Sequence, residues 1–412
     1  MKRISNVIHS WKRDHPGEPF SAYIYDLGEL KRHAARIVAT LPAGAAYYYA
    51  IKANSDPKII EALLSVAAGF EVASLGEAEK VREVSREASI IFGGPGKTDD
   101  EIENALRLRV SLLHVESTAE LLRVNWIAER LDLKADILLR VNLRGPLPAG
   151  TLQMCGVPSQ FGIDEADIPQ AIELAQSCSY VALKGFHFHS LSNHLDAHQH
   201  AAMVGHYIER ARHWQSRYGF DLHYVNAGGG VGINYEHLES PFDWESFVQK
   251  LGQIIGQEAG ESAPSLFPEI LFECGRYTVA SCGYYAAEVL DIKRIGGSHF
   301  AVVNGGLHHF LLPGAWKHRH PLFVVPVESW PYPWPRMEIH DLPVTIVGRM
   351  NSTRDILARN EPMTRLRAGD VLVFPYAGAY GWSISAHGFS SLEHPQFFVS
   401  KLAKSCNRVQ SK

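Results

Sequence analysis

The stretch that decides the fold is Tyr47-Tyr48-Tyr49-Ala50-Ile51-Lys52-Ala53-Asn54-Ser55-Asp56-Pro57. Its aromatic and apolar residues favour a buried β-strand, and the Asn-Ser-Asp-Pro phrase behind them is typical of a turn and helix start. Lys52 is therefore predicted at the carboxyl end of a strand. A lysine is costly to desolvate there unless it is paired or converted to a Schiff base, whereas an isolated lysine usually extends its ammonium group to water. The rest of the chain decides between these interpretations.

The composition is that of a globular protein larger than one ordinary domain. The chain has 412 residues, of which 46% are apolar and 20% charged, with a formal net charge of -4. Basic residues are not in excess, which argues against a nucleic-acid partner, and no apolar run is long enough to span a membrane. The polar start at residues 1–6 does not resemble a signal peptide, and the five cysteines lack metal-type Cys-x-x-Cys spacing. We therefore expect a cytoplasmic location with reduced thiols.

Strand-like segments alternate with helical segments over the first two thirds of the chain. Eight such strands predict right-handed parallel crossovers and closure into a (β/α)8 barrel, in which catalytic groups come from the carboxyl ends of the strands. The predicted strands are Tyr47–Ile51, Phe70–Ala73, Ser89–Phe92, Ser111–Val115, Ala135–Val141, Leu183–Phe188, His223–Asn226 and Glu269–Phe272.

Beyond the eighth strand the pattern changes to β-rich segments without helices between them. This predicts a second, C-terminal antiparallel β-barrel domain, with the alternating segment Ser21–Asp26 returned to it as a strand. The predicted boundaries are an N-terminal arm and strand at 1–26, the barrel at 27–280, the β domain at 281–400 and a polar tail at 401–412.

Glycines gather after the seventh and eighth predicted strands. Gly228, Gly229 and Gly230 follow one, and Glu273-Cys274-Gly275-Arg276 closes the other. Glycines let backbone N–H groups approach an anion, and these are the loops where such barrels often hold a phosphate. The alternative for the glycine triplet alone is a sharp turn.

Histidines mark the sixth strand. His187 and His189 share one face, because strand side chains alternate with a period of two. Three interpretations remain open: a metal pair extended by His194, His198 and His200, a histidine satisfied within the core, and an imidazole stacked on a flat cofactor. The metal interpretation needs ligands at other strand ends, and we predict no metal site.

The phrase Gly93-Gly94-Pro95-Gly96-Lys97-Thr98 imitates a nucleotide-binding loop. The first glycine that this motif requires would fall at Ile91, so the motif fails. We interpret the phrase as a turn at a strand end.

Taken in order, these motifs resemble the fold-type III decarboxylases that depend on pyridoxal 5'-phosphate (PLP), a family that includes the ornithine and diaminopimelate enzymes. The resemblance covers residues 20–395, and its motifs are highly specific as an ordered set. The matching phrases are Tyr49-Ala50-Ile51-Lys52-Ala53-Asn54, Phe70-Glu71-Val72-Ala73-Ser74, Leu139-Arg140-Val141, Gln160-Phe161-Gly162-Ile163, His189-x-x-Ser192, Gly228-Gly229-Gly230, Glu273-Cys274-Gly275-Arg276 and Gly378-Ala379-Tyr380.

This resemblance implies a role for each matched residue. Lys52 would carry PLP as a Schiff base, Glu273 would keep the pyridine nitrogen protonated, and His189 would stack on the ring. Glu71 and Arg140 would orient the ring and the lysine. The residues implied around the phosphate are Ser192, Gly228, Gly229, Gly230, Gly275, Arg276 and Tyr380.

Members of this family form homodimers with shared active sites, in which the β domain of one subunit enters the site of the other. The corresponding stretch here is 348–355. Asp355 matches a family aspartate, whereas Asn351 stands where many members have a cysteine that helps to protonate the carbanion. We include Asn351 and Asp355 among the predicted catalytic residues, and Lys52, His189 or a water as alternative proton donors.

Three further stretches are His-Phe-His-Ser at 187–190, Phe-Gly-Gly-Pro-Gly-Lys-Thr at 92–98 and Tyr-Ala-Gly-Ala-Tyr-Gly-Trp-Ser-Ile-Ser at 376–385. By these stretches the chain is most similar, within the family, to the decarboxylases of citrate-based siderophore pathways, such as that of staphyloferrin B. This implies a citryl-amino acid substrate, citryl-diaminopropionate or citryl-serine. Diamine-forming relatives bind a distal ammonium through an aspartate, but this chain has Asn304-Gly305-Gly306 followed by potential cations, which fits an anionic substrate arm. Those potential cations are His308, His309, Lys317, His318, Arg319 and His320. The alternative for this segment is a solvated loop without a binding role. The alternatives for the whole chain are a diaminopimelate or ornithine-type decarboxylase and a non-catalytic PLP-binding homologue.

Overall fold

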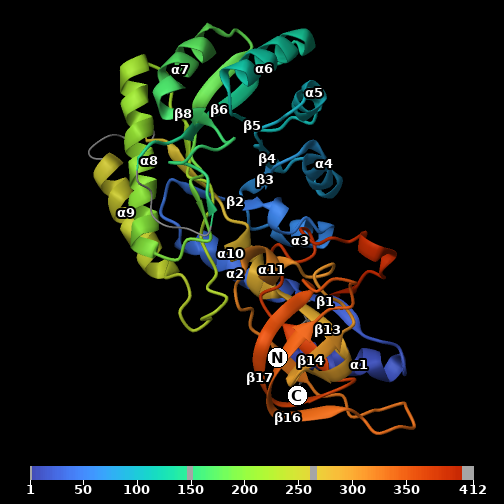
Figure 1. Ribbon diagram of the computed structural model, residues 1–412. Helices are drawn as coiled ribbons and strands as arrows, with labels where there is room; N and C mark the ends of the chain where they lie inside the picture. Colours follow the sequence, from blue (N-terminus) through green and yellow to red (C-terminus); the bar gives the residue numbers. More distant parts are fainter. Residues whose placement is uncertain (1, 146–151, 260–266, 401–412) are drawn as a thin grey trace, which may run out of the picture. The chain divides into compact units, whose positions relative to one another are not determined.

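The computed structural model describes residues 2–145, 152–259 and 267–400. The chain divides into two compact units, each described here by itself. His33–Thr278 form the barrel unit, and Met1–Arg32 together with Val279–Lys412 form the β unit (Figure 1). Two helices, α2 (Leu27–Thr40) and α10 (Arg276–Val279), contain the points where the chain passes from one unit to the other. The predicted polar tail at 401–412 lies outside the described residues.

Eight parallel strands close on themselves in the barrel unit. Each strand pairs with the next along the chain, and the eighth pairs with the first, so that no edge remains. The predicted (β/α)8 barrel is confirmed. Its strands are β2 (Ala45–Ala50), β3 (Gly69–Val72), β4 (Ser89–Phe92), β5 (Leu112–Val115), β6 (Ala135–Asn142), β9 (Val181–His187), β11 (Tyr224–Asn226) and β12 (Glu269–Glu273).

Helices follow most of these strands, and short polar residues begin them. Asp56 precedes Pro57, the first residue of α3, and its side chain accepts a hydrogen bond from Lys58 N. Thr98 forms a reciprocal capping box with Glu101 at the start of α5. Such caps satisfy amides that have no partner within the helix. The helices are α3 (Pro57–Leu63), α4 (Leu75–Val84), α5 (Asp99–Arg107), α6 (Thr118–Leu131), α7 (Ile168–Ser177), α8 (Ala197–Tyr218) and α9 (Trp244–Ala259), with short strands β7 (Leu152–Gln153), β8 (Ile163–Asp164) and β10 (Leu191–Ser192) between them.

The barrel interior changes from apolar to polar along the strands. Buried side chains from four strands form an apolar cluster, namely Ile91, Leu112, Leu138 and Leu271. Two residues further along three of these strands come His114, Arg140 and Glu273, all buried. Because strand side chains repeat with a period of two, these polar residues face the same interior one layer closer to the carboxyl ends. The apolar layer is therefore the floor beneath a polar one.

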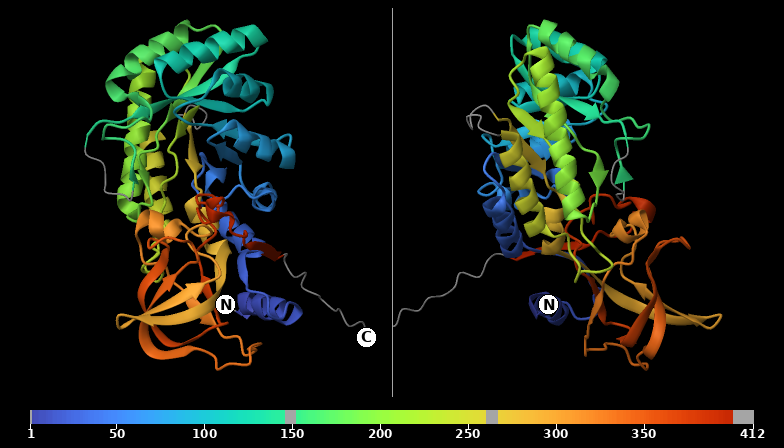
Figure 2. Two further views of the ribbon diagram at one scale, coloured as in Figure 1. Left: turned by 45° about the vertical axis from the view of Figure 1, so that its right-hand side comes forward. Right: turned by 90° about the vertical axis from the view of Figure 1, so that its left-hand side faces the viewer.

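The β unit is a curled, mostly antiparallel sheet, drawn largely in orange in Figure 2. Strand β1 (Ser21–Asp26) pairs with β13 and β19, and residues 2–14, for which the sequence indicated only an arm, form the helix α1 (Lys2–Asp14). Buried Ile4, Ile8 and Trp11 attach this helix to the sheet core. The remaining elements are β13 (Gly283–Ile295), β14 (Ser298–Val303), α11 (Leu312–Trp316), β15 (Phe323–Val325), β16 (Glu338–Val347), β17 (Ile356–Arg367), β18 (Val371–Phe374) and β19 (Gln396–Ser400).

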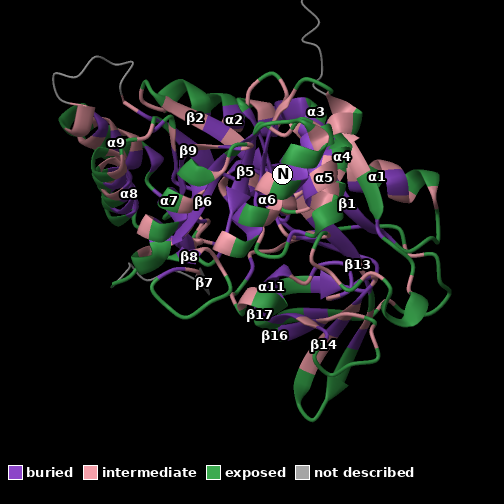
Figure 3. Ribbon diagram, turned by 90° about the horizontal axis from the view of Figure 1, so that it is seen from above, coloured by how far each residue is buried: buried purple, intermediate pink, exposed green. Residues whose placement is uncertain are grey.

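Burial follows this architecture. The barrel strands are mostly buried, and the helices around them carry their exposed residues outward (Figure 3). Among the described residues, no helix has both the length and the apolar character that crossing a membrane requires.

Candidate active site

Lys52 lies in a single 3-10 turn, Ile51–Ala53, directly after the first barrel strand. Its Nζ is 3.0 Å from Glu71 Oε1, and its side chain is 37% exposed whereas that of Glu71 is 5% exposed. An accessible amine is thus held by a buried carboxylate. Burial raises the pKa of Glu71 to about 7, against the opposing effect of the Lys52 charge. The second oxygen, Glu71 Oε2, is buried without a hydrogen-bond partner among the described residues.

Glu273, at the end of the eighth strand, is the centre of a second buried group. Its Oε1 accepts a hydrogen bond from Asn226 Nδ2 at 2.6 Å, and its Oε2 lies 3.5 Å from His187 Nε2. The ring of His114 stacks on that of His187 with centroids 3.8 Å apart. Burial is the main cause that lowers the pKa of both histidines well below the ordinary value, so both imidazoles are neutral.

These three residues also bear on the metal question. Among the described residues, His114, His187 and Glu273 are the one group of three histidine, cysteine or acidic side chains close enough to share an ion. His194 and His200 instead face each other, with Nδ1 atoms 3.3 Å apart, and His198 is exposed. The ligand set suggested by the sequence, His187 with His189, His194, His198 and His200, is therefore not brought together.

His189 and the glycine loop lie side by side. The backbone N–H of Gly229 donates to His189 Nδ1 at 3.1 Å, which fixes the orientation of the half-buried imidazole. Burial, together with the charges of Lys52 and Arg140, lowers the pKa of His189 well below its usual value. Ser192 lies in β10 beyond His189, and Gly230 O accepts a hydrogen bond from His194 N just after that strand, at 2.8 Å.

The glycines leave no room for side chains. A Cβ at Gly229 would lie 2.4 Å from Glu273 O, and one at Gly230 would lie 2.7 Å from Leu191 O. Gly230 also has a φ of +95°, which disfavours other residues. Gly275 is in close contact with the backbone of β2, and buried Arg276 donates from Nη1 to Tyr235 Oη at 3.2 Å. The hydrogen bond between Arg276 and Tyr235 thus joins the loop after the eighth strand to the loop after the seventh, which contains the glycines.

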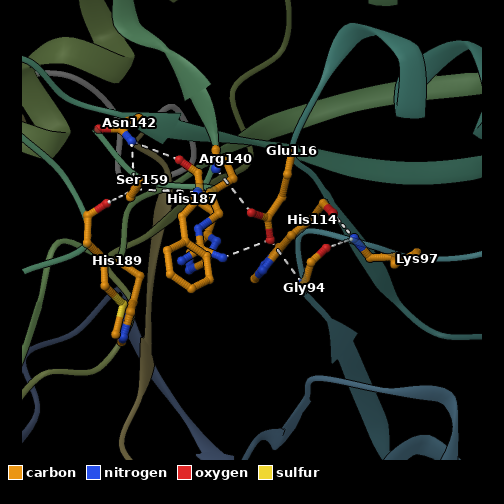
Figure 4. A network of polar contacts seen from close by, with 12 residues as sticks. Gly94, Lys97, His114, Glu116, Arg140, Asn142, Ser159, His187 and His189 are labelled. Carbon is orange, nitrogen blue, oxygen red and sulfur yellow. Dashed lines mark hydrogen bonds and ion pairs between the residues drawn. The ribbon is translucent and has the colours of Figure 1, made fainter. Parts of the chain in front are cut away.

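Arg140 belongs to a buried network that sequence reasoning missed (Figure 4). Its Nη1 is 2.7 Å from Glu116 Oε1, and the two oxygens of Glu116 also accept hydrogen bonds from Gly94 N and Gly162 N, each at 3.0 Å. The Cζ atom of Arg140 lies over the ring of Phe161, 4.6 Å from the ring centroid. Glu116 follows β5, the fourth barrel strand, in the phrase His114-Val115-Glu116, so its position at a strand end was the available signal.

Lys97, in the phrase that imitates a nucleotide-binding loop, is an internal anchor. Its Nζ lies 2.6 Å from Glu120 Oε1 and donates to Gly94 O and His114 O. The turn that follows β4 is thereby fixed to the end of β5. The Lys97 side chain is 2% exposed and so has no role in binding a nucleotide phosphate.

The predicted site residues of the β unit are Asn351, Asp355 and Tyr380. Asn351 is exposed, whereas Asp355 is buried, and its two oxygens accept hydrogen bonds from Leu307 N at 2.7 Å and Met350 N at 2.8 Å. Desolvation raises the pKa of Asp355. Tyr380 is partly buried and has a φ of +52°. Asp355 therefore ties the stretch 348–355 to the turn at 305–307.

The histidines proposed as cations need correction. Burial lowers the pKa of His308 to about 4 and that of His309 and His320 to about 3, so all three are neutral at physiological pH. They are neither cations nor part of a solvated loop. Lys317 and Arg319 remain exposed cations of this region, and Arg319 pairs with both oxygens of Glu361.

A family profile described as "Pyridoxal-dependent decarboxylase, pyridoxal binding domain" matches residues 27–280. The chain belongs to this family. It is a decarboxylase that uses pyridoxal 5'-phosphate as its cofactor and a small molecule as its substrate. The barrel unit with its lysine, carboxylate and glycine loops is the part of the chain that the profile covers.

Similar proteins agree with this assignment. The chain is 43% identical over 397 residues to 2-[(L-alanin-3-ylcarbamoyl)methyl]-2-hydroxybutanedioate decarboxylase of Staphylococcus aureus, which covers 96% of this chain and 98% of the relative. It is 29% identical to the diaminopimelate decarboxylase of Campylobacter jejuni, over 89% of this chain and 87% of the relative. The crystal structure of Helicobacter pylori diaminopimelate decarboxylase with L-lysine has a TM-score of 0.82 at 25% identity, covering 95% and 94% of the two chains.

Proposed function

We propose that this enzyme decarboxylates a carboxylate-rich amino acid, namely a citryl-amino acid such as citryl-diaminopropionate or citryl-serine, in siderophore biosynthesis. The observation that carries the proposal is the 43% identity to the Staphylococcus aureus enzyme over nearly all of both chains. The name of that relative describes a hydroxylated, citrate-like dicarboxylate joined through an amide to C3 of alanine. A cytoplasmic location is part of the proposal.

A groove in the β unit supports an anionic substrate arm. Its volume is about 590 Å3, and its lining contributes four exposed cations against one carboxylate, Glu361. The cations are Lys317, Arg319, Arg354 and Arg359. Guanidinium groups bind carboxylates through paired hydrogen bonds, so this lining favours a polycarboxylate over a diamine.

The residues of the barrel fit PLP. The glycine loops admit no Cβ, as expected where backbone N–H groups must approach a phosphate, and Arg276 lies in the same segment of chain. The buried carboxylate of Glu273 suits a protonated pyridine nitrogen, and the exposed amine of Lys52 suits a carbonyl. When bound, PLP supplies a conjugated ring that accepts the electron pair released when CO2 leaves.

The remaining work falls to side chains of this chain. We assign Glu273 to hold a proton at the ring nitrogen, His189 to stack on the ring, and Glu71 and Arg140 to orient the lysine and the ring. Ser192, Gly228, Gly229, Gly230, Gly275, Arg276 and Tyr380 are proposed to bind the phosphate. His189 contributes no positive charge to the site, because burial lowers its pKa and its imidazole is neutral.

Decarboxylation breaks the bond between the α-carbon and its carboxylate, and a proton must then return to that carbon. Asn351 cannot supply this proton, since a carboxamide is not an acid at neutral pH. Lys52 is an amine accessible in the barrel, and it is paired with a carboxyl group whose pKa lies at about 7. We therefore assign Lys52 or a water as the proton donor and treat Asn351 as a contact to the substrate.

We further propose a homodimer in which the stretch 348–355, held in shape by Asp355, completes the active site of the partner subunit. Mixing two inactive variants tests this arrangement. If Lys52 and Asp355 act in one site but come from different subunits, an equimolar mixture of Lys52→Ala and Asp355→Ala regains about a quarter of wild-type activity, because about half of the dimers are mixed and each of these has one intact site. Mixtures that stay inactive, from variants that each form dimers, would contradict shared sites.

The test of the substrate is CO2 release from five compounds: citryl-diaminopropionate, citryl-serine, diaminopimelate, ornithine and lysine. We expect a kcat/KM for a citryl compound at least about a hundredfold above that for ornithine. The similarity to diaminopimelate decarboxylases at 27–29% identity makes diaminopimelate the second candidate. Release from diaminopimelate alone would replace the proposal, and release from none would reject it in favour of another amino acid substrate.

A further inference from the structure

Asn226 joins the two parts of the site that are expected to grip opposite ends of the cofactor. It lies at the carboxyl end of β11 and is fully buried. Its Nδ2 donates to Glu273 Oε1 at 2.6 Å, and its Oδ1 accepts a hydrogen bond from Gly228 N at 2.9 Å. One side chain thus touches the carboxylate of the eighth strand and the first amide of the glycine loop.

The second hydrogen of this amide also has an acceptor. Asn226 Nδ2 lies 3.2 Å from His114 Nε2, whose imidazole is neutral and therefore has one nitrogen that accepts. Both donors and the oxygen of the carboxamide therefore have partners within this buried layer. Turning the amide over would place its oxygen 2.6 Å from a carboxylate oxygen, so its orientation is fixed by chemistry.

The neighbours of Asn226 require an amide rather than an acid. Glu273 Oε1 and His114 Nε2 both offer lone pairs, and a carboxylate at 226 would have no hydrogen for either. The same contacts bear on the possible ion site. Two of its three residues, His114 and Glu273, already accept hydrogens from Asn226, so the cluster is arranged around an amide.

We propose that Asn226 is a positioning residue that fixes the ring-nitrogen carboxylate relative to the turn that opens the phosphate loop. The assignment rests on the proposed roles of Glu273 and of Gly228 to Gly230. Its two ends do different work. The acceptor end shapes the loop and so governs how tightly PLP is held. The donor end holds the Glu273 carboxylate in one orientation, which governs the reaction.

Two substitutions separate the two ends. Asn226→Asp keeps the acceptor for Gly228 N but places a carboxyl group against Glu273, and two carboxylates so close cannot both ionise at neutral pH. Asn226→Ala removes both ends. The matched control is Asn125→Asp, because Asn125 also accepts a backbone hydrogen bond, from Tyr180 N at 3.0 Å, far along the chain from the site.

The measurements are the PLP dissociation constant, the pH titration of the visible absorption of the bound cofactor, and kcat, each on protein whose apo form unfolds cooperatively. For Asn226→Asp we expect a PLP dissociation constant within about threefold of wild type, a kcat lowered about tenfold or more, and an absorption midpoint moved by about one pH unit. For Asn226→Ala we expect PLP affinity to fall about tenfold or more as well. The Asn125→Asp control should match wild type in all three.

Three results would overturn the assignment: an Asn226→Asp variant equal to wild type in kcat and titration, two variants that lose PLP affinity to the same extent, or an Asn226→Ala variant that holds PLP as tightly as wild type. If Asn226→Ala does not fold, the contrast between affinity and kcat in Asn226→Asp decides alone. Wild-type protein that binds no PLP would instead reject the proposed function, and the position-226 assignment with it.

Discussion

The polar layer of the barrel and the groove of the β unit both gather charge, but they treat it in opposite ways. In the barrel, Arg140 pairs with Glu116 and Lys97 pairs with Glu120, and all four side chains are less than 10% exposed. In the groove, the cations are exposed and outnumber the single carboxylate. Buried charges that are paired hold a geometry, whereas exposed charges in excess remain available to an anion.

This difference assigns the two regions different work. A buried network resists rearrangement because each loss of a partner leaves a charge in a medium that solvates it poorly. Such rigidity suits the grip on a cofactor, which is the same for every member of a family. Exposed cations can be exchanged at little cost to stability, which suits the choice of substrate.

The sharpest way to break the barrel side of the comparison is Lys52→Ala. We expect activity to fall at least about a thousandfold, because the amine has no substitute as the group that joins a carbonyl. Borohydride treatment of wild-type holoenzyme should add the reduced cofactor to the peptide that contains Lys52, which peptide mass spectrometry detects. Lys80→Ala is the control, since Lys80 is an exposed lysine that bonds nearby Ser55. An unmodified Lys52 peptide in active enzyme would refute the assignment.

The buried pairs of the barrel should be costly to break. Lys97→Met leaves Glu120 and two carbonyl groups without their donor, and we expect the free energy of unfolding to fall by about 3–5 kcal/mol in denaturant titrations. Arg107→Met, which removes an exposed pair with Glu103 on α5, should cost less than about 1 kcal/mol. Equal losses in the two variants would mean that Lys97 contributes no more than a surface charge.

The sequence predicted the barrel well because its signals are local and repeated. Alternating strands and helices, together with a cap such as Asp56 before Pro57, are visible without any tertiary contact. The same period of two predicts which residues share a face, as for His187 and His189. Helix α1 was missed because its apolar residues make sense only once the sheet they contact is known.

The site was predicted in part, and the missing part is long-range. Lys52, Glu273 and the glycines stand in recognisable motifs, whereas Asn226 and Glu116 gain meaning only through partners 47 and 24 residues away. The charge state of the histidines could not be predicted either, because burial lowers the pKa of His308, which the sequence does not show. Sequence motifs therefore identify the reactive residues, whereas tertiary contacts determine the protonation state of the histidines.

The pH dependence of stability tests the raised pKa of buried Glu71 in the barrel. The pKa of Glu71 rises from 4.5 to about 7 on folding, so the folded state binds a proton more tightly than the unfolded state. Stability of the apoenzyme should therefore be highest below pH 4.5 for this group and fall as pH rises to about 7, by on the order of 3 kcal/mol in all. Glu71→Gln should flatten that fall in thermal unfolding curves, and the exposed Glu79→Gln should not. A fall unchanged in Glu71→Gln would contradict the raised pKa.

The groove offers the smallest but most selective effect. Arg354→Ala removes one of several exposed cations, so we expect the KM for citryl-diaminopropionate to rise about tenfold, equivalent to about 1.4 kcal/mol, with kcat little changed. The KM for ornithine should not rise, because a diamine gains nothing from a guanidinium. Arg365→Ala is the matched control, since Arg365 is an exposed arginine of β17 outside the groove that pairs with Glu338. If both arginines change KM alike, or if ornithine and the citryl compound respond alike, the groove does not select the anionic arm, and that selection must lie in the barrel.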